Sequence, residues 1–342
     1  MSDYKTLKGI QINVVDSDPS NLFQGQIWYN SSSETLKVRN LGAGAWTTGG
    51  TTNFATTTAG SAGTQTAGLI TGGYNAAPGD AVNLNNTDEY NGVDWTAGGT
   101  LNETKQAPGV SGTQTAAFCA GGKSGPYPSG SVTTDSEEYN GTDWTEGNNL
   151  QTARQAVARA GTQTAGLLMA GHIPGDPGDD EQKLCEEYNG TSWSEEGDLN
   201  TERKMYDAGC GTQTAALVGG GHVAPNTIGD MVITESYDGS SWSEVADLSN
   251  GRNQCPQFGT QTASVVCGGG PFGAYKTIVE EWNGASWSTG TALSTGRTQA
   301  SGFGISTAGM CATGTTTGSN YGIATCEEGA KADAVETVTH SS

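Results

Sequence analysis

Short apolar runs made mostly of small residues return along the chain about every fifty residues, each directly after Gly-Thr-Gln-Thr or a close relative of it. A brief apolar run bounded by glycines predicts a strand that is buried on both faces. Small side chains suit a place where several sheets crowd together, so we expect these runs to be the inner strands of a radially repeated fold. The clearest runs are 67–73, 116–122, 165–171, 215–221 and 263–270.

A second pattern is in phase with the first: an aromatic residue, then Asn-Gly or Asp-Gly, then a tryptophan, as in Tyr90-Asn91-Gly92 before Trp95. Asn-Gly between two strands is a strong hairpin signal, for which a type I′ turn is the usual form. Each repeat is therefore predicted to be a four-stranded meander, with the tryptophan filling space between neighbouring sheets. The other tryptophans of this series are Trp144, Trp193, Trp242 and Trp287.

Repeats of this length indicate a propeller, a solenoid or an array. We predict an all-β, six-bladed β propeller, with seven blades as the alternative if residues 26–30 add further strands. The last repeat lacks its aromatic pair, whereas residues 36–46 resemble the missing outer hairpin, and Trp46 lies 49 residues before Trp95. We expect N-terminal strands within 25–50 to complete the last blade, which leaves no free sheet edge.

The predicted domains are an N-terminal docking arm (1–24), the propeller (25–330) and a C-terminal tail (331–342). The arm contains one alternating strand that needs a partner, and this suggests docking onto a larger assembly. A frayed terminus is the alternative. Residues 324–328 echo residues 184–187, so the end of the propeller segment is expected to hold a strand.

Charge limits the partners. The chain has 36 acidic and 15 basic residues, a net charge of −21, which repels phosphate backbones and anionic lipids. We therefore expect no nucleic-acid partner and no membrane insertion, and the absence of a recognisable secretory segment suggests assembly in a cytoplasm. The seven cysteines are expected to be free thiols.

A cation recurs just before each inner strand and is predicted to form a ring of charge at one mouth of the channel. These cations are expected to tie blades together through carbonyls and carboxylates, and ligand binding by them is the alternative. The five cations are Lys105, Arg154, Arg203, Arg252 and Arg297.

The segments between the second and third strands differ in every repeat, whereas the two hairpin turns barely change. In a four-stranded meander these segments emerge at one end, and a fixed scaffold with variable loops is the architecture of a binding face. Unconstrained solvent-facing spacers are the alternative. The candidate contacts are Tyr74, Tyr127, His172, His222, Phe272 and Tyr275.

No catalytic or metal-binding motif stands out. His172 and His222 share a slot in adjacent repeats but have no matched third ligand, and the acids at 176–181 do not fit a calcium loop. Nucleophile-elbow, phosphate-loop and zinc-protease patterns are missing from the sequence. We expect a protein without enzymatic activity, metal or cofactor.

Paired glycines, an aromatic residue, a tryptophan and then an arginine make up the kelch pattern, and Gly121-Gly122, Tyr139, Trp144 and Arg154 show it in order. Over residues 35–330 the chain resembles kelch-type β propellers. Lys105 in place of the arginine and Ala170 in place of the first paired glycine are departures that weaken a uniform ring of cations.

The chain is similar in sequence to virion proteins of marine tailed phages, including cyanophages. The similarity lies in residues 26–32, 36–39 and 45–50, together with the Gly-Thr-Gln-Thr-Ala repeats. The resemblance implies a virion protein in multiple copies: a tail fibre or spike component that recognises a host-surface glycan or protein and contacts other virion proteins through its arm. Alternatives are a capsid, collar or neck decoration protein, an intracellular kelch adaptor, or a kelch-type copper oxidase. The last needs several histidines, and this chain has three.

Overall fold

The computed structural model describes residues 6–7, 10–19, 26–77, 81–175, 180–223, 230–270, 274–316 and 321–337. The chain divides into two compact units, which we call the terminal unit (1–45 with 330–342) and the repeat unit (46–329). Strands β5 (Thr35–Thr56) and β34 (Ile323–Thr337) contribute residues to both units. The predicted boundaries at 24 and 330 therefore differ from the observed division, which leaves residues 26–45 outside the repeat unit.

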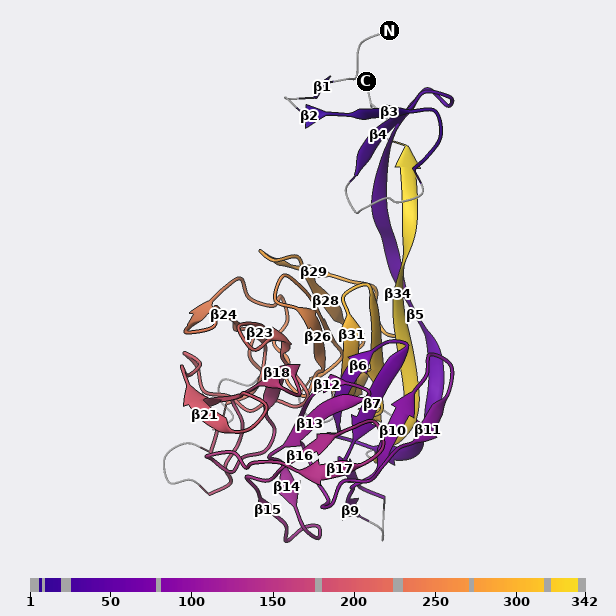
Figure 1. The fold of residues 1–342 in the computed structure, drawn as a ribbon. Coiled ribbons are helices and arrows are strands. Elements are labelled where there is room, and N and C mark those ends of the chain that lie inside the picture. The colour runs from indigo at the N-terminus through magenta and orange to yellow at the C-terminus, as the bar shows by residue number, and fades with distance from the viewer. Residues whose placement is uncertain are drawn as a thin grey trace. The chain divides into compact units, whose positions relative to one another are not determined.

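The repeat unit contains five four-stranded antiparallel sheets, each following the chain as a meander, and Figure 1 shows them side by side around a common centre. The predicted all-β architecture and four-stranded repeat are thereby confirmed. The strands, in order from the inner to the outer edge, are β6 (Gly60–Thr64), β7 (Ala67–Thr71), β10 (Thr87–Tyr90) and β11 (Trp95–Ala97); β12 (Gly109–Thr113), β13 (Ala116–Ala120), β16 (Ser136–Tyr139) and β17 (Trp144–Glu146); β18 (Ala158–Thr162), β19 (Ala165–Met169), β20 (Cys185–Tyr188) and β21 (Trp193–Glu196); β22 (Cys210–Thr212), β23 (Ala215–Gly219), β24 (Thr234–Tyr237) and β25 (Trp242–Glu244); β26 (Gln257–Thr260), β27 (Ala263–Cys267), β28 (Val279–Trp282) and β29 (Trp287–Thr289).

The remaining sheet combines both ends of the chain. Its order is β3-β4-β5-β34-β32-β31, where β31 is Ser301–Ile305 and β32 is Ala308–Ala312. The N-terminal segment therefore supplies the fourth strand only, and the third strand comes from the C-terminal segment that echoes residues 184–187. The expected hairpin at 36–46 is wrong, because β5 runs through this segment as one strand. Trp46 nevertheless takes the expected place: it packs against the cluster containing Ala300 and Cys311, and its Nε1 donates to the Thr291 carbonyl at 2.9 Å.

The inner strands contact one another in cyclic order: β6, β12, β18, β22, β26, β31 and again β6. A series of backbone hydrogen bonds just before these strands follows the same circle. Ala107 N donates to Thr58 O at 2.9 Å, and Thr58 N donates to Gln299 O at 2.9 Å, which joins the last sheet to the first. Sheets that succeed one another in this way have the arrangement of a β propeller.

The apolar runs form the second strand of each sheet, next to the innermost one, and glycine in these strands has a packing reason. A Cβ added at Gly68 would lie 2.1 Å from the ring of Phe303, and one added at Gly166 would lie 2.4 Å from Phe118. The aromatic ring of one sheet thus presses on the backbone of the next. This contact explains why the apolar runs are built from small residues, as the sequence suggested.

The turn before each tryptophan differs from the expected type I′ form. Tyr90 pairs with Trp95, so the connection has the four residues 91–94, and only Gly92 of the Asn-Gly pair has a positive φ, 93°. The Oδ1 atom of Asn91 accepts hydrogen bonds from the amides of Val93 and Asp94, both at 2.9 Å. Asparagine is therefore present for this side-chain cap and not for a left-handed backbone.

The terminal unit is organised around Asp18. Its carboxylate accepts hydrogen bonds from Trp28 Nε1 at 3.0 Å, Asn30 Nδ2 at 2.7 Å and Lys37 Nζ at 2.6 Å, and these lower the pKa of Asp18 to about 2, with Lys37 the largest contributor. Strand β3 (Asn13–Val15) pairs in parallel with β4 (Ile27–Asn30), which pairs with β5. The strand expected to need a partner thus finds one within the chain, and residues 26–30 add no further blade to the repeat unit.

All seven cysteines lie buried as free thiols. Within the described residues, no helix is long and apolar enough to cross a membrane.

Candidate functional site

The variable segments and the links between sheets emerge at one end of the sheets, which we call the loop end. The Gly-Thr-Gln-Thr and Asn-Gly turns lie at the other, the turn end. Two of the variable segments form small two-stranded extensions: β8 (Tyr74–Asn75) pairs with β9 (Val82–Asn83), and β14 (Lys123–Ser124) pairs with β15 (Ser131–Val132). The expected loops thus carry ordered hairpins.

Two of the predicted contact residues meet at the loop end. The rings of Tyr74 and Tyr127 have centroids 4.6 Å apart and are tilted by 37°. Partial burial, followed by the hydrogen bond with Tyr127, raises the pKa of Tyr74 to about 12. Tyr127 remains 42% exposed, so one side of this aromatic pair is open to a ligand.

A groove of about 460 Å³ runs beside Tyr127, between the β8–β9 and β14–β15 hairpins. Asn83 lies in its wall and is only 5% exposed. Its Nδ2 donates to the Gly125 carbonyl at 2.9 Å, whereas its Oδ1 is buried and has no hydrogen-bond donor among the residues that the structure describes. The sequence analysis did not select Asn83, since an asparagine in a variable loop gives no signal of burial.

The two histidines do not converge. Nδ1 of His172 lies 3.9 Å from Glu181, which also receives Nζ of Lys204 at 2.8 Å. Burial, with the Lys204 charge second, lowers the pKa of His172. His222 instead approaches Asn253, with 3.4 Å between its Nδ1 and the amide nitrogen. Across the described part of the chain, no group of three or more His, Cys, Asp or Glu side chains is placed to hold a metal.

Of the remaining predictions at the loop end, Tyr275 is half-buried, and Phe272 falls outside the described residues. So do Asp176 and Asp179 of the acidic segment.

The expected ring of charge at a channel mouth is wrong. Lys105, Arg154, Arg203 and Arg252 are 0% exposed and Arg297 is 1% exposed. Each arginine pairs with a buried glutamate on the third strand of its own sheet, because desolvated guanidinium groups need a charged partner. The pairs are Arg154–Glu186, Arg203–Glu235, Arg252–Glu280 and Arg297–Glu327.

The contacts of these cations fit a structural role, in which they hold blades together. The Arg203 guanidinium also donates to the carbonyls of Gly220 and Ile233, both at 3.0 Å. Glu235 in turn accepts from the backbone amide of Asn200, in the link from the preceding sheet, at 2.7 Å. One buried pair therefore anchors the link between two sheets. Lys105 is the weaker case, with its Nζ 3.9 Å from Asp135.

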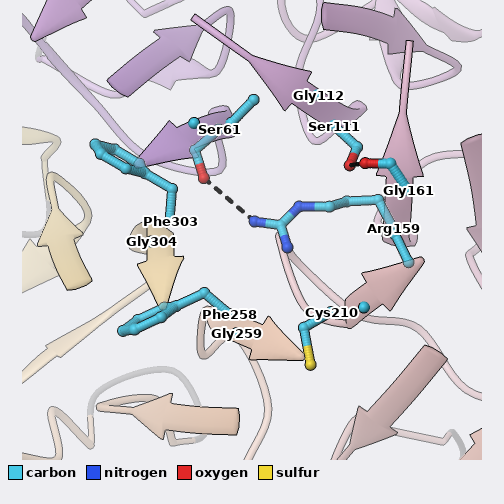
Figure 2. A pocket seen from close by; sticks show the side chains of 14 residues that line it. Ser61, Ser111, Gly112, Arg159, Gly161, Cys210, Phe258, Gly259, Phe303 and Gly304 are labelled. Atoms are coloured by element: carbon cyan, nitrogen blue, oxygen red, sulfur yellow. Dashed lines mark hydrogen bonds between the residues drawn. The ribbon is translucent and has the colours of Figure 1, made fainter. Parts of the chain in front are cut away.

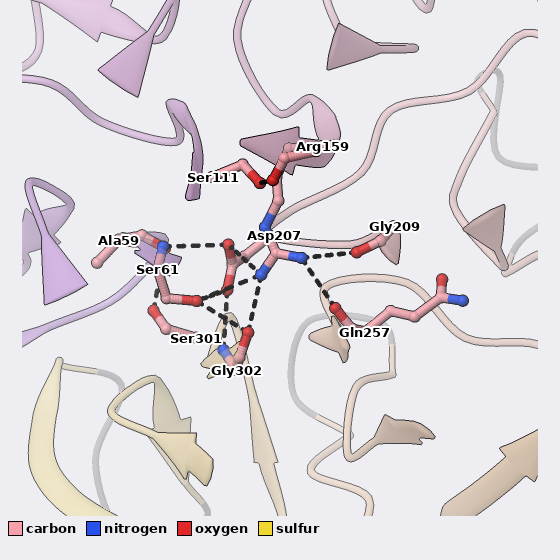
Figure 3. Close-up of polar contacts among 10 residues, drawn as sticks. Ala59, Ser61, Ser111, Arg159, Asp207, Gly209, Gln257, Ser301 and Gly302 are labelled. Carbon is pink, nitrogen blue, oxygen red and sulfur yellow. Dashed lines mark hydrogen bonds and ion pairs between the residues drawn. The ribbon is translucent and has the colours of Figure 1, made fainter. Parts of the chain in front are cut away.

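The sequence analysis missed a charged pair at the centre of the repeat unit, Arg159 and Asp207, which are 6% and 4% exposed (Figure 3). Nη2 of Arg159 lies 3.2 Å from Asp207, and the guanidinium donates to carbonyls of three different sheets. The accepting carbonyls are Gly209 at 2.6 Å, Gln257 at 3.0 Å and Gly302 at 2.8 Å.

Asp207 receives the backbone amides of Ser61 at 3.2 Å and Gly302 at 2.8 Å. Burial nevertheless raises the pKa of Asp207 to about 6, against the lowering effect of Arg159 and of these hydrogen bonds. The pair links five sheets across the centre and closes it with charged side chains.

One extra residue delivers Asp207 to this position. From Arg154 to Gly161 the spacing is seven residues, whereas from Arg203 to Gly211 it is eight. Asp207 has a left-handed backbone with φ 49°, a conformation that aspartate tolerates better than most residues. The repeat analysis could have found this insertion, together with an arginine where other inner strands carry Ser61, Gly209 or Gly302.

A polar cavity of about 150 Å³ lies at the centre on the turn-end side of Arg159 (Figure 2). Its wall is built from the inner strands and their glycines. The guanidinium of Arg159 already donates hydrogen bonds to the protein, and only its Nε has no acceptor among the described residues. Arg159 therefore has a structural role at this cavity. Among the described residues that line it, no acid, base and nucleophile converge on one point.

No protein-family model matches this chain, and no curated protein matches it. Many solved structures match its fold; one, titled "Structure of YjhT", has a TM-score of 0.65 and covers 80% of this chain and 95% of its own. The identity is 13%, so the likeness is one of fold alone. Because propellers support many unrelated activities, this likeness carries no inference about function.

Proposed function

We propose that this chain is a six-bladed, kelch-like β propeller of a tailed-phage virion, a non-enzymatic component of a tail fibre or spike whose loop end recognises a host-surface glycan or protein. The blade number rests on six inner strands that contact one another in cyclic order and on the last sheet, which the two ends of the chain complete. In such a ring each sheet has a neighbouring sheet on both sides.

The observation that carries the binding role is the contrast between contacts that recur from blade to blade and the variable segments of the loop end. Buried ion pairs and side-chain caps recur from blade to blade, whereas the loop end changes in every repeat and exposes an aromatic pair beside a groove. Exposed aromatic rings on a rigid scaffold are a common feature of recognition surfaces.

The virion role rests on the similarity of residues 26–50 to phage appendage proteins. Part of that segment, from Trp28 to Lys37, forms the hydrogen-bonded centre of the terminal unit. The terminal unit is the part we assign to contact with other virion proteins. Multiple copies on one particle would make weak binding per copy sufficient through avidity.

Immunoelectron microscopy and adsorption assays test the proposal together. Antibodies against the purified protein should label the tail tip or fibres of the phage that encodes this chain, and the purified protein should slow adsorption of that phage to its host. Labelling of the capsid or collar, without any effect on adsorption, would establish the decoration alternative. Particles that do not carry the protein would refute a virion role altogether.

The decoration alternative has one observation in its favour. The Arg159–Asp207 pair joins several sheets at the centre, and the buried arginine pairs anchor links between sheets. A body tied together in this way suits a protein that covers a joint. Virions in which segment 123–132 is replaced by Gly and Ser would then adsorb normally, whereas the receptor-binding proposal expects slower adsorption.

A further inference from the structure

The sheet of the terminal unit has two different faces. Its register places Val14 beside Tyr29, and Tyr29 beside Leu36. It also places Ile27, two residues before Tyr29, beside Val38. Paired residues of neighbouring strands project to the same side of a sheet, and so do alternate residues of one strand. These five side chains, aliphatic or aromatic, therefore form one face, which we call the apolar face.

The opposite face is closed within the chain. It carries Trp28, which is 0% exposed, with Asn13 and Lys37 beside it in the register. The carboxylate of Asp18 accepts hydrogen bonds from Trp28, Asn30 and Lys37 and so covers this side. The terminal unit thus uses its own residues for one face of the sheet.

The apolar face, in contrast, is open to solvent. Val14 is 48% exposed and Ile27 is 45% exposed, and the other three members are partly exposed. Among the described side chains of the terminal unit, the buried apolar ones are Ile12 and Trp28. A small unit with so little buried apolar surface is marginally stable by itself, and oligomerisation is a common remedy. The apolar face therefore needs a cover.

The chemistry of the face and the time at which it needs a cover favour a second copy of this chain. A partner that arrives during particle assembly comes after the terminal unit has folded, whereas other copies of the chain are synthesised alongside it. The face carries no charged side chain, so it is complementary to itself, and two sheets pack face to face about 10 Å apart. A two-fold pair of this kind covers both faces and is closed.

Charge is distributed unevenly between the two units and favours the same contact. Residues 1–45 contain 4 acidic and 4 basic residues, and residues 330–342 contain 2 acidic and 1 basic. The terminal unit therefore has a net charge of −1, and the repeat unit carries −20 of the chain's −21. Repeat units of two copies repel each other, whereas two terminal units can approach.

We propose that two copies of this chain pair through the apolar faces of their terminal units, related by a two-fold axis. The contact buries Val14 and Ile27 of both copies and gives each dimer two loop ends. This inference goes beyond the proposed function, in which the terminal unit contacts other virion proteins. Two loop ends on one dimer also add avidity to any binding at that end.

The first test measures the mass of the full-length purified protein by sedimentation velocity. The mass should be twice the 35.0 kDa of the single chain. The dimer should persist when NaCl is raised from about 0.05 M to about 0.5 M, because salt screens the repulsion between repeat units and leaves an apolar contact intact. A mass of one chain or of three, or dissociation at the higher salt, overturns the proposal.

The second test places charge on the apolar face. Ile27→Glu should raise the dissociation constant of the dimer about tenfold or more, because burial of an unpaired carboxylate is unfavourable. The matched control is Val93→Glu, since Val93 is 70% exposed in the turn before Trp95 of the repeat unit. It should leave the dissociation constant unchanged, and equal weakening by the two substitutions contradicts the assigned face.

A mixture of variants separates loss of the contact from loss of folding. Ile27→Lys should weaken the dimer as Ile27→Glu does, since both place like charges on facing surfaces. An equimolar mixture of the two variants should form a mixed dimer that is tighter than either variant alone, because the charges are then opposite. Misfolded variants do not regain a dimer on mixing. A mixture that is no tighter than its components overturns the pairing.

This proposal and the proposed function can fail separately. A monomer that slows phage adsorption overturns the dimer and leaves the receptor-binding function standing. A dimer that has no effect on adsorption supports the pairing and counts against receptor binding at the loop end.

Discussion

The two ends of the sheets obey different constraints. At the turn end, the glutamine of each Gly-Thr-Gln-Thr sequence reaches back to the preceding sheet: Gln114 Nε2 donates to the carbonyls of Gly68 at 3.0 Å and Tyr90 at 2.7 Å. Gln163, Gln213 and Gln261 make the same type of contact, and Gln65 makes it with the last sheet, through Gly309 and Gly329.

At the loop end, one bridging position carries Tyr74, Lys123, His172 and His222 in successive repeats, each with the same backbone pairing and a different side-chain environment. The same residue therefore recurs wherever a side chain must join two sheets in the same way in each repeat. Where only the backbone is needed, the side chain is free to change and to serve recognition.

The largest expected effect is at the buried ion pairs. Arg203→Met leaves Glu235 buried without its cation and should lower the free energy of unfolding by about 3–5 kcal/mol, measured in urea. The matched control is Lys123→Met in a variable segment, whose Nζ donates to the Pro128 carbonyl at 2.9 Å in an exposed contact, and which should cost about 1 kcal/mol or less. An equal loss of unfolding free energy for the two substitutions would contradict the distinction between the recurring scaffold contacts and the variable segments.

A smaller effect concerns pH and the central pair. Because burial raises the pKa of Asp207 to about 6 from its usual 3.8, the folded state holds this proton more tightly than the unfolded state does. This contribution is fully present below pH 4, is lost as pH rises through about 6, and amounts to about 3 kcal/mol.

The measurement is the difference in unfolding free energy between wild type and Asp207→Asn from pH 4 to pH 7. Wild type should lose stability relative to the variant across that interval, since asparagine does not titrate. A difference that is constant with pH would show that Asp207 keeps an ordinary pKa.

At the turn end, Gln163→Ala removes two hydrogen bonds, to the carbonyls of Ala117 at 3.1 Å and Tyr139 at 2.7 Å. The expected loss is about 1–2 kcal/mol in the free energy of unfolding, measured in urea. Ser306 stands where the last repeat lacks this glutamine. Ser306→Gln should therefore be neutral or mildly stabilising, and a large loss there would contradict the assigned role of the glutamines.

The smallest stability effect is expected at the loop end. Tyr127→Ala should change the free energy of unfolding by about 1 kcal/mol or less, since the ring is 42% exposed and its aromatic contact is with Tyr74 of a loop-end hairpin. The same substitution should give the largest loss of binding to the host surface. A stability cost above that of Gln163→Ala would mean that Tyr127 belongs to the scaffold.

Much of the fold could be predicted because the repeat signals are local. Apolar runs, Asn-Gly turns and tryptophans each report a strand or a turn from a few adjacent residues, and their period indicates the architecture. The assignment of the third strand of the last sheet to residues 323–337 could not be predicted with the same security, because that strand lacks the aromatic residue: Gly329 stands at the position that Tyr90 and Tyr139 occupy in other sheets.

The candidate site was predicted in part. Tyr74 and Tyr127 were selected from variability and prove to be neighbours, but the variability gave no reason to pair them with each other or to include Asn83. The cations before the inner strands were recognised as a series, and their burial was not, because a recurring arginine looks the same at a channel mouth and in a closed ion pair.

By itself, the sequence determined the number and kind of strands in each repeat, the position of the glycines and the end of the sheets at which variation is concentrated. These properties depend on residues close together in the chain. Only the tertiary structure decided which carboxylate each cation meets, how one extra residue carries Asp207 to Arg159, and which two loops form a groove. Those contacts join residues from different sheets, and their energy depends on burial and distance, which exist only once the chain has folded.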